Sequence, residues 1–225
     1  MKELLPGQAA SMESLFSIAR STLNNTTADI NERAHAQCWL TYRFCDGLID
    51  EKEWRNQVNN FSVQSQKARW ATSLATAKFY AYVLLDEWDN AKEQCDIVHA
   101  VPIKDHPPAI TNRGRIVTIL ARHQASLGET NEAVSACRAF LSSWKETCAS
   151  IDLEATPVWL VDSQAASMAA AHAALRILAE ILPVPKFPNV EWCDNLIKGY
   201  QTTPWWKCIL RNGGPFSLPT NKKIS

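Results

Sequence analysis

Arg115, Thr118 and Arg122 are the residues whose types and spacing best suit the binding of a charged ligand, because their intervals place all three on one face of a helix. Guanidinium groups bind carboxylates and phosphates through paired hydrogen bonds. The sequence therefore predicts a ligand-binding stripe at these positions. The alternative is that the arginines are solvated surface groups that keep the protein in solution.

A metal site is the next candidate, because His35 and Cys38 lie three residues apart and Cys45 follows two helical turns later. A closed zinc site needs four ligands and usually shows paired ligands at short spacing. We therefore expect packed cysteines beside a partly exposed histidine, and no bound metal. We expect the remaining histidines at the surface or the edge of the core: His99, His106, His123 and His172.

Acid–base chemistry has one candidate, the carboxylates of Asp86, Glu87 and Asp89. Neighbouring like charges raise the pKa of one carboxyl group, but this segment also suits a solvated turn before a helix N-terminus, which we favour. The sequence contains no P-loop, dinucleotide-binding glycine fingerprint, zinc-protease, nucleophile-elbow or kinase motif. We therefore assign no catalytic residue and no cofactor, although a site assembled from distant residues stays possible.

Composition and charge limit the number of domains and the classes of partner that this chain is expected to have. The chain has 225 residues, of which 46% are apolar and 20% charged, so it can bury a core in one large or two small domains. Lysine plus arginine equals aspartate plus glutamate at 23 each, so no overall field attracts nucleic acid or anionic lipid. We expect no nucleic-acid partner and no membrane association.

The cellular setting follows from the termini and the cysteines. Residues 1–16 lack the continuous apolar stretch of a signal peptide, and the most apolar segment, 165–182, is interrupted by His172, Arg176 and Glu180. Seven cysteines are scattered without a Cys-x-x-Cys pair, which is typical of reduced, buried thiols. We therefore expect a soluble, cytoplasmic protein.

Helices are expected throughout the chain. Only three glycines occur between Gln8 and Lys198, no proline interrupts residues 8–101, and long alternating β-branched runs are absent. The fold class is therefore predicted to be all-α. Gly128 is expected to end one helix and Thr130 or Asn131 to cap the next, which gives a tight helical hairpin.

The hairpin pattern recurs upstream, in a frame set by Leu48, Leu85 and Leu127. Small or apolar residues follow each leucine after six, ten and thirteen positions: Trp54, Val58 and Phe61; Ala91, Cys95 and Val98; Ala133, Cys137 and Phe140. Self-similarity of this kind indicates a helical repeat.

These positions resemble the tetratricopeptide repeat, through Leu127-Gly128, Glu132-Ala133 and Phe140 in particular. Two upstream positions depart from its pattern, because Asp86 replaces the glycine of the turn and Trp54 replaces an alanine. The resemblance implies stacked antiparallel hairpins in an α-solenoid, at about 31–64, 68–101 and 113–148. These hairpins and an N-terminal helix form a predicted domain of residues 1–150.

The C-terminal part is predicted to cap the end of the solenoid. Helices are expected near 162–182 and 190–200 within the region 151–210, with Trp192, Trp205 and Trp206 covering apolar surface. Residues 211–225 contain glycines and prolines and are expected to form an extended or disordered tail.

The resemblance also implies a ligand-binding groove, because the first helix of each tetratricopeptide-like pair lines a concave face. The side chains predicted to bind a peptide there are Trp39, Arg43, Ser73, Thr76, Tyr80, Arg115, Thr118 and Arg122. An acidic segment of a partner, or its free C-terminal carboxylate, would suit such a groove. We therefore expect a non-enzymatic interaction or scaffold module.

Three other functions stay open at this point. Stripes of arginine with Trp39 and Tyr80 would also suit RNA, through phosphate contacts and base stacking. The chain would equally serve as the helical accessory domain of an enzyme. A structural subunit of a large particle is the third alternative, and self-association into an oligomer is possible in each case.

Overall fold

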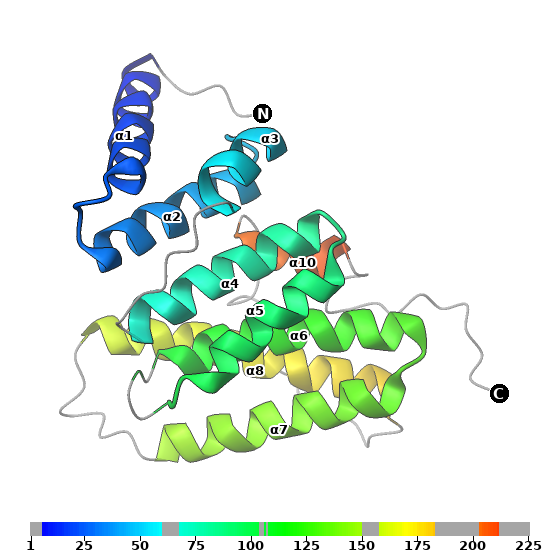
Figure 1. Ribbon diagram of the computed structural model, residues 1–225. Coiled ribbons are helices and arrows are strands. Elements are labelled where there is room, and N and C mark those ends of the chain that lie inside the picture. Colours follow the sequence, from blue (N-terminus) through cyan, green and yellow to red (C-terminus); the bar gives the residue numbers. More distant parts are fainter. Residues whose placement is uncertain are drawn as a thin grey trace. The chain divides into compact units, whose positions relative to one another are not determined.

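Every regular element in the described part of the chain is a helix (Figure 1). The computed structural model describes residues 6–59, 68–103, 106, 108–149, 158–182 and 203–211. Within these ranges the all-α fold class predicted from the sequence is confirmed. The scarcity of glycine and proline explains the result, because little in these segments interrupts backbone hydrogen bonding from one turn to the next.

The chain divides into two units, Met1–Ile97 and Val98–Ser225, and each is described by itself. The elements of unit 1 are α1 (Pro6–Asn24), α2 (Ile30–Cys45), α3 (Glu51–Trp54), a π-helical turn (Arg55–Asn59), α4 (Ala68–Leu84) and most of α5 (Trp88–Ala100). Those of unit 2 are α6 (Ala109–Leu127), α7 (Thr130–Ala149), α8 (Val158–Ile181) and α10 (Pro204–Arg211).

In unit 1, α2 and α4 pack side by side and run in the same direction. The ring centroids of His35 and Trp70 are 4.5 Å apart near the start of both helices, and those of Tyr42 and Tyr80 are 6.3 Å apart near their ends. Small and apolar side chains fill the space between the two helices: Ala34, Cys38, Leu74 and Ala77. The ordered pairing of contacts therefore establishes parallel packing.

Trp54 is the centre of a second packing cluster in unit 1. Its fully buried indole stacks on Phe44 with ring centroids 4.9 Å apart and meets the edge of Tyr82 at 5.6 Å. The indole N–H donates a hydrogen bond of 3.3 Å to Oγ1 of Thr41 on α2. The large indole is thus accommodated by aromatic packing and one buried polar contact.

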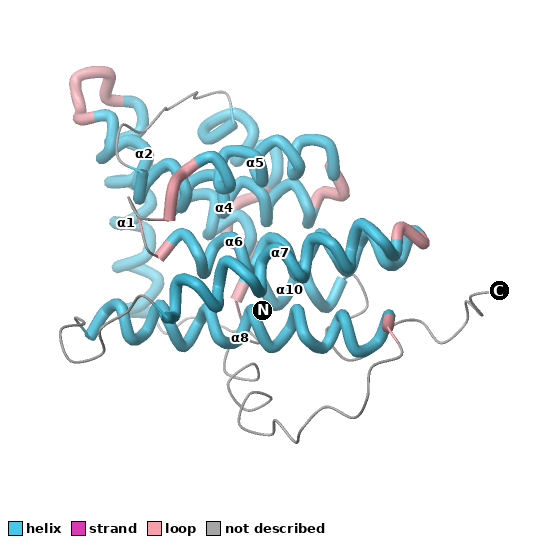
Figure 2. The backbone as a smooth tube through the Cα atoms, turned by 90° about the horizontal axis from the view of Figure 1, so that it is seen from below, coloured by secondary structure: helices cyan, strands magenta, loops and turns pink. Residues whose placement is uncertain are grey.

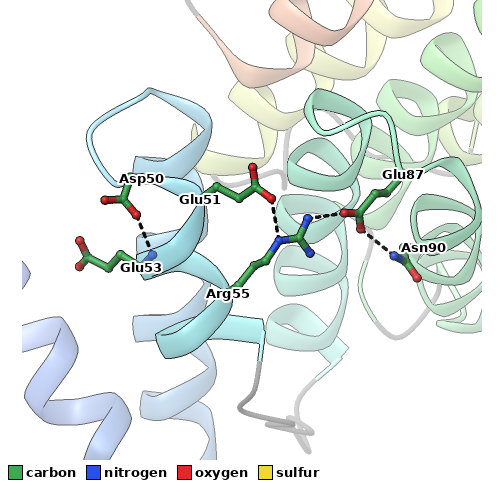
Figure 3. Close-up of polar contacts among 6 residues, drawn as sticks. All are labelled: Asp50, Glu51, Glu53, Arg55, Glu87 and Asn90. Atoms are coloured by element: carbon green, nitrogen blue, oxygen red, sulfur yellow. Dashed lines mark hydrogen bonds and ion pairs between the residues drawn. The ribbon is translucent and has the colours of Figure 1, made fainter.

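Arg55, in the π-helical turn, links α3 to the start of α5 (Figure 3). Its Nε donates to Glu51 at 2.8 Å, and its Nη2 pairs with Glu87, which also accepts a hydrogen bond of 2.7 Å from Asn90. The hydrogen bond from Arg55 lowers the pKa of Glu87, and the reciprocal bond raises the pKa of Arg55. Glu87 is therefore held ionised, as suits a structural carboxylate and not a proton donor.

Asp86 adopts a left-handed backbone conformation, with φ of 67°, at the turn before α5. Aspartate tolerates this region better than most side chains because it forms local hydrogen bonds. Here Oδ1 of Asp86 accepts a bond of 2.9 Å from the indole N–H of Trp88.

Unit 2 has a core formed by α6, α7 and α8, which Figure 2 shows as neighbouring helices. Gly114 permits a close approach: a Cβ atom there would lie 2.7 Å from Cβ of Ala170 on α8 and 2.7 Å from Cε2 of Phe140 on α7. Farther along the same two helices, Arg122 of α6 pairs with Glu180 of α8. Consequently α6 and α8 also pack in parallel.

The turn between α6 and α7 has the helix end at Gly128 that the sequence predicts, but the predicted cap of the next helix is wrong, because Thr130 is already its first residue and the carbonyl of Glu129 accepts the N–H of Ala133 at 3.2 Å. Gly128 follows Leu127 with φ of 87°, and its N–H donates to the carbonyl of Ala125 at 3.2 Å. The N–H of Glu129 donates to the carbonyl of Gln124 at 2.9 Å, which completes a glycine-terminated helix end. The next helix, α7, then begins at Thr130.

The repeat positions differ in burial from the leucines that frame them. Leu48 and Leu127 are exposed, whereas the residues six and ten positions after each leucine are buried. The residues thirteen positions on, Val98 and Phe140, are buried too, and Phe61 lies outside the described residues. The small-residue positions therefore form the helix contacts, and the leucines mark only the ends of the first helices.

The C-terminal region differs in detail from the prediction. The alanine-rich helix α8 begins at Val158 and not near residue 162, and α10 lies where no separate helix was expected. The predicted helix near 190–200, Trp192, the side chain of Trp206 and the tail from residue 212 lie outside the described residues.

Candidate functional site

The strongest candidate site is a surface of α2 and α4 in unit 1 on which aromatic and cationic side chains gather. Helical spacing places His35, Trp39 and Tyr42 on one side of α2 and Arg69 and Ser73 on one side of α4, next to Trp70. His35 and Arg69 are exposed, and the others are half-buried. We call these six residues the aromatic face: His35, Trp39, Tyr42, Arg69, Trp70 and Ser73.

On the α1 side of this face, aromatic rings and guanidinium groups alternate. The guanidinium of Arg43 lies over the indole of Trp39, 5.4 Å from the ring centroid, and Trp39 meets the ring of Phe16 edge-on at 5.1 Å. Arg20 in turn lies 5.2 Å from the centroid of Phe16. Because Arg43 also pairs with Asp46 at 3.0 Å, its charge is already partly compensated.

On the α4 side, Trp70 lies between a histidine and an arginine. The ring of His35 is tilted by 31° against the Trp70 indole, and the guanidinium of Arg69 lies 4.6 Å from the Trp70 ring centroid. Over the ranges that the structure covers, Arg69 has no ion pair. The indole holds the guanidinium in place, and the planar N–H groups have the geometry to pair with a carboxylate.

This arrangement suits the recognition of a carboxylate next to an apolar or aromatic group. Arg69 offers paired donors for a carboxylate, and Trp39 and Tyr42 offer partly exposed rings for apolar contact. The arrangement of these side chains is therefore suited to binding such a ligand.

The residues that the sequence predicted for peptide binding fall into two groups in unit 1. Trp39, Arg43 and Ser73 are half-buried and lie at or beside the aromatic face. Thr76 and Tyr80 are buried; the Thr76 hydroxyl donates to the carbonyl of Thr72 at 2.7 Å, and the Tyr80 ring packs near Tyr42. Only the first group is placed to touch a ligand directly.

The three predicted residues on α6 are brought together, but within the packed interior of unit 2. Arg122 is 0% exposed and holds both carboxylate oxygens of Glu180, with Nη2 to Oε1 at 3.0 Å. Thr118 is buried and accepts a hydrogen bond of 3.0 Å from the indole N–H of Trp205 on α10. The guanidinium of the half-buried Arg115 lies 5.9 Å from the centroid of that indole. The stripe exists, and α8 and α10 cover it.

Sequence reasoning missed four members of the aromatic face: His35, Tyr42, Arg69 and Trp70. The signals were present, since His35, Trp39 and Tyr42 follow helical spacing and Arg69 adjoins Trp70. His35 was weighed as a metal ligand and expected to be a partly exposed histidine, and no binding role was assigned to Trp70, Trp88 or Trp144. All three tryptophans are half-buried, and each offers part of its indole to the surface or to a polar partner.

A shallow polar hollow of about 470 Å³ lies beside α3. Its lining residues are Arg20, Asp50, Lys52, Glu53, Asn56 and Gln57. Three of its charged groups are already engaged, because Arg20 pairs with Glu53 and the Asp50 carboxylate accepts the N–H of Glu53 at 2.7 Å. The hollow therefore has less free charge than its composition suggests.

The described ranges contain no group of three or more histidine, cysteine or acidic side chains that could hold a metal ion. In particular, Cys38 packs into the α2–α4 contact while His35 contacts Trp70. Among the helices whose residues are described, none combines the length and hydrophobicity needed to span a bilayer.

The five cysteines whose side chains are described are buried thiols, namely Cys38, Cys45, Cys95, Cys137 and Cys208. Burial raises the pKa of Cys38 to about 12, and it is also the main cause of pKa values of about 12 for Cys95 and Cys137. These three thiols are therefore protonated at neutral pH and poor nucleophiles.

We expect iodoacetamide at pH 8 to leave Cys38, Cys95 and Cys137 unmodified in the folded chain and to alkylate them rapidly in guanidinium chloride. The thiolate is the reactive form, and burial suppresses both its formation and its access to the reagent. Mass spectrometry of digested protein measures each site separately. Labelling of Cys38 in the folded chain at the rate of an unfolded peptide would contradict its burial.

No protein-family model, curated protein or solved structure matches this chain in sequence or structure comparisons.

Proposed function

We propose that this chain is a non-enzymatic interaction module that binds an extended, acidic segment of a partner protein along the aromatic face. The observation that carries the proposal is Arg69, which is exposed, held against Trp70 and without an ion pair in the described ranges. A guanidinium already held in place loses less conformational freedom when it binds a carboxylate. Trp39 and Tyr42 supply the apolar contacts that an acidic segment needs for more than weak, salt-sensitive binding.

The packing of the helices supports a tetratricopeptide-like arrangement as the framework of this module. In such an arrangement the first helix of each pair packs in parallel against the first helix of the next pair. The contacts of α2 with α4, and of α6 with α8, have this direction. The stacking of all the pairs into one solenoid is part of the proposal.

Selection from a random library of short peptides on the wild-type chain is expected to enrich aspartate and glutamate next to apolar residues. We expect Arg69→Glu to weaken binding of the selected peptides about tenfold or more, since charge reversal replaces attraction with repulsion. Trp39→Ala should weaken the same peptides through lost ring contact. Fluorescence anisotropy with labelled peptides measures both effects.

The matched control for Arg69→Glu is Arg138→Glu, which makes the same charge change at an exposed position on α7. It should leave both peptide affinity and helical circular dichroism at the wild-type level. Selected peptides without acidic enrichment, or equal losses in the two variants, would refute specific recognition at the aromatic face.

Single-stranded RNA is the second candidate ligand, and it is favoured by the partly exposed rings of Trp39, Tyr42 and Trp70, on which bases could stack. The zero formal net charge argues against it. A labelled oligouridylate that binds at low salt, releases as salt rises and loses affinity in Trp39→Ala would favour RNA over the peptide. Absence of binding at low salt would exclude this candidate.

A further inference from the structure

The contact of α10 with α6 in unit 2 is made by a short helix whose buried side chains complete the core after a long connection from α8. The helix α10 has eight residues and is separated from the end of α8 by residues 182–203. Isolated helices of this length are unstable in water. The helical form of α10 therefore depends on its packing, and α6 is a packing partner within unit 2.

The recognition chemistry is concentrated on one side of α10. Trp205, Cys208 and Ile209 are buried, and their spacing defines a single helix face. The polar atom of the Trp205 indole is satisfied by Thr118, at 3.0 Å, and the guanidinium of Arg115 lies 5.9 Å from the ring centroid. This site favours tryptophan over other aromatic side chains for three reasons. It offers an apolar surface for the ring, a hydrogen-bond acceptor for the indole N–H, and a cation near the ring.

We propose that this face of α6 is a binding site for a tryptophan-bearing amphipathic helix of a partner protein, and that α10 occupies the site until the partner displaces it. The fit of α10 defines the required ligand, which has tryptophan followed four positions later by an aliphatic residue, as Trp205 is followed by Ile209. Insertion of such a helix into a groove is a common mode of recognition. The site is independent of the aromatic face and of its ligand.

The direct test uses the full-length chain carrying Trp205→Ala, which vacates the site, and a labelled peptide of residues 201–212. We expect the peptide to bind this variant about tenfold or more tightly than it binds the wild-type chain, because a tethered helix competes at high effective concentration. A peptide carrying Trp205→Ala should not bind. Adding Thr118→Val to the variant chain should weaken the wild-type peptide severalfold by removing the acceptor. Equal peptide binding to the variant and wild-type chains, or none to a variant with wild-type helicity, would overturn the proposal.

A second measurement avoids any dependence on the folding of the Trp205→Ala chain. In the wild-type protein Cys208 is fully buried at the α10 contact. A peptide of residues 201–212 with Cys208→Ser, added at about millimolar concentration to compete with the tethered helix, should speed alkylation of Cys208 about tenfold. Mass spectrometry of the Cys208 fragment measures the rate. An unchanged rate at this concentration would show that α10 is a permanent part of the core.

Discussion

Gly114→Val is expected to destabilise unit 2 by about 3 kcal/mol or more, because a side chain at this position has no space between α7 and α8. The Cβ atom alone would lie 2.7 Å from Cβ of Ala170. Since that atom is fixed to the backbone of α8, the clash requires a shift of the helix and not only a new rotamer. Valine adds two further methyl groups at the same crossing.

Thermal unfolding followed by circular dichroism should show this loss as a fall of about 10 °C in the transition of unit 2. Gly128→Ala is the matched control, because a Cβ atom at Gly128 meets nothing within 4 Å. The control is expected to lose only about 1 kcal/mol of stability, because alanine is strained in the left-handed backbone conformation of this position. If Gly114→Val unfolds at the same temperature as the control, the close approach of α6 to α8 is not required for stability.

Glu180→Leu is expected to cost about 3 kcal/mol, because it leaves the guanidinium of Arg122 buried without its carboxylate. The pair is formed by a fully buried arginine and a glutamate whose side chain is 20% exposed. Removing one partner of such a pair costs more than removing both, since the remaining charge is left desolvated and uncompensated.

The double variant Arg122→Met with Glu180→Leu should therefore be more stable than Glu180→Leu alone. Urea denaturation of the wild type, both single variants and the double variant forms a double-mutant cycle that isolates the coupling. A coupling near zero would mean that Arg122 finds other partners, and that the ion pair does not determine the packing of α6 on α8.

The fold could be predicted largely from local chemistry. Gly128 correctly predicted the end of α6, because glycine readily adopts the left-handed backbone conformation that often follows the last turn of a helix. The structure has that conformation at Gly128. The helix contacts at Ala91, Cys95, Ala133 and Cys137 followed from small residues at helical spacing. These are properties of short segments, which sequence patterns report well.

Access to the predicted binding residues could not be predicted in the same way. Spacing correctly placed Arg115, Thr118 and Arg122 together on α6. Whether a stripe is open depends on segments far away in sequence, and here Glu180 and Trp205 cover it. An arginine stripe that faces solvent and one that serves a buried ion pair are identical in sequence. The surroundings of Arg69 were likewise not predictable from spacing. Its guanidinium lies over Trp70, and the Trp70 ring in turn contacts His35 on another helix.

The parallel packing of α2 and α4 also gives unit 1 an electrical polarity. Each helix has a macrodipole with partial positive charge at its N-terminus, and side-by-side helices of the same direction add these charges at one end. Asp29 and Glu32 lie at that end of α2, and Arg69 lies in the first turn of α4. Because those two carboxylates already offset the N-terminal charge of α2, an anionic ligand would meet the Arg69 guanidinium and the start of α4 at this end of the aromatic face, and an extended segment would bind with its most acidic part there.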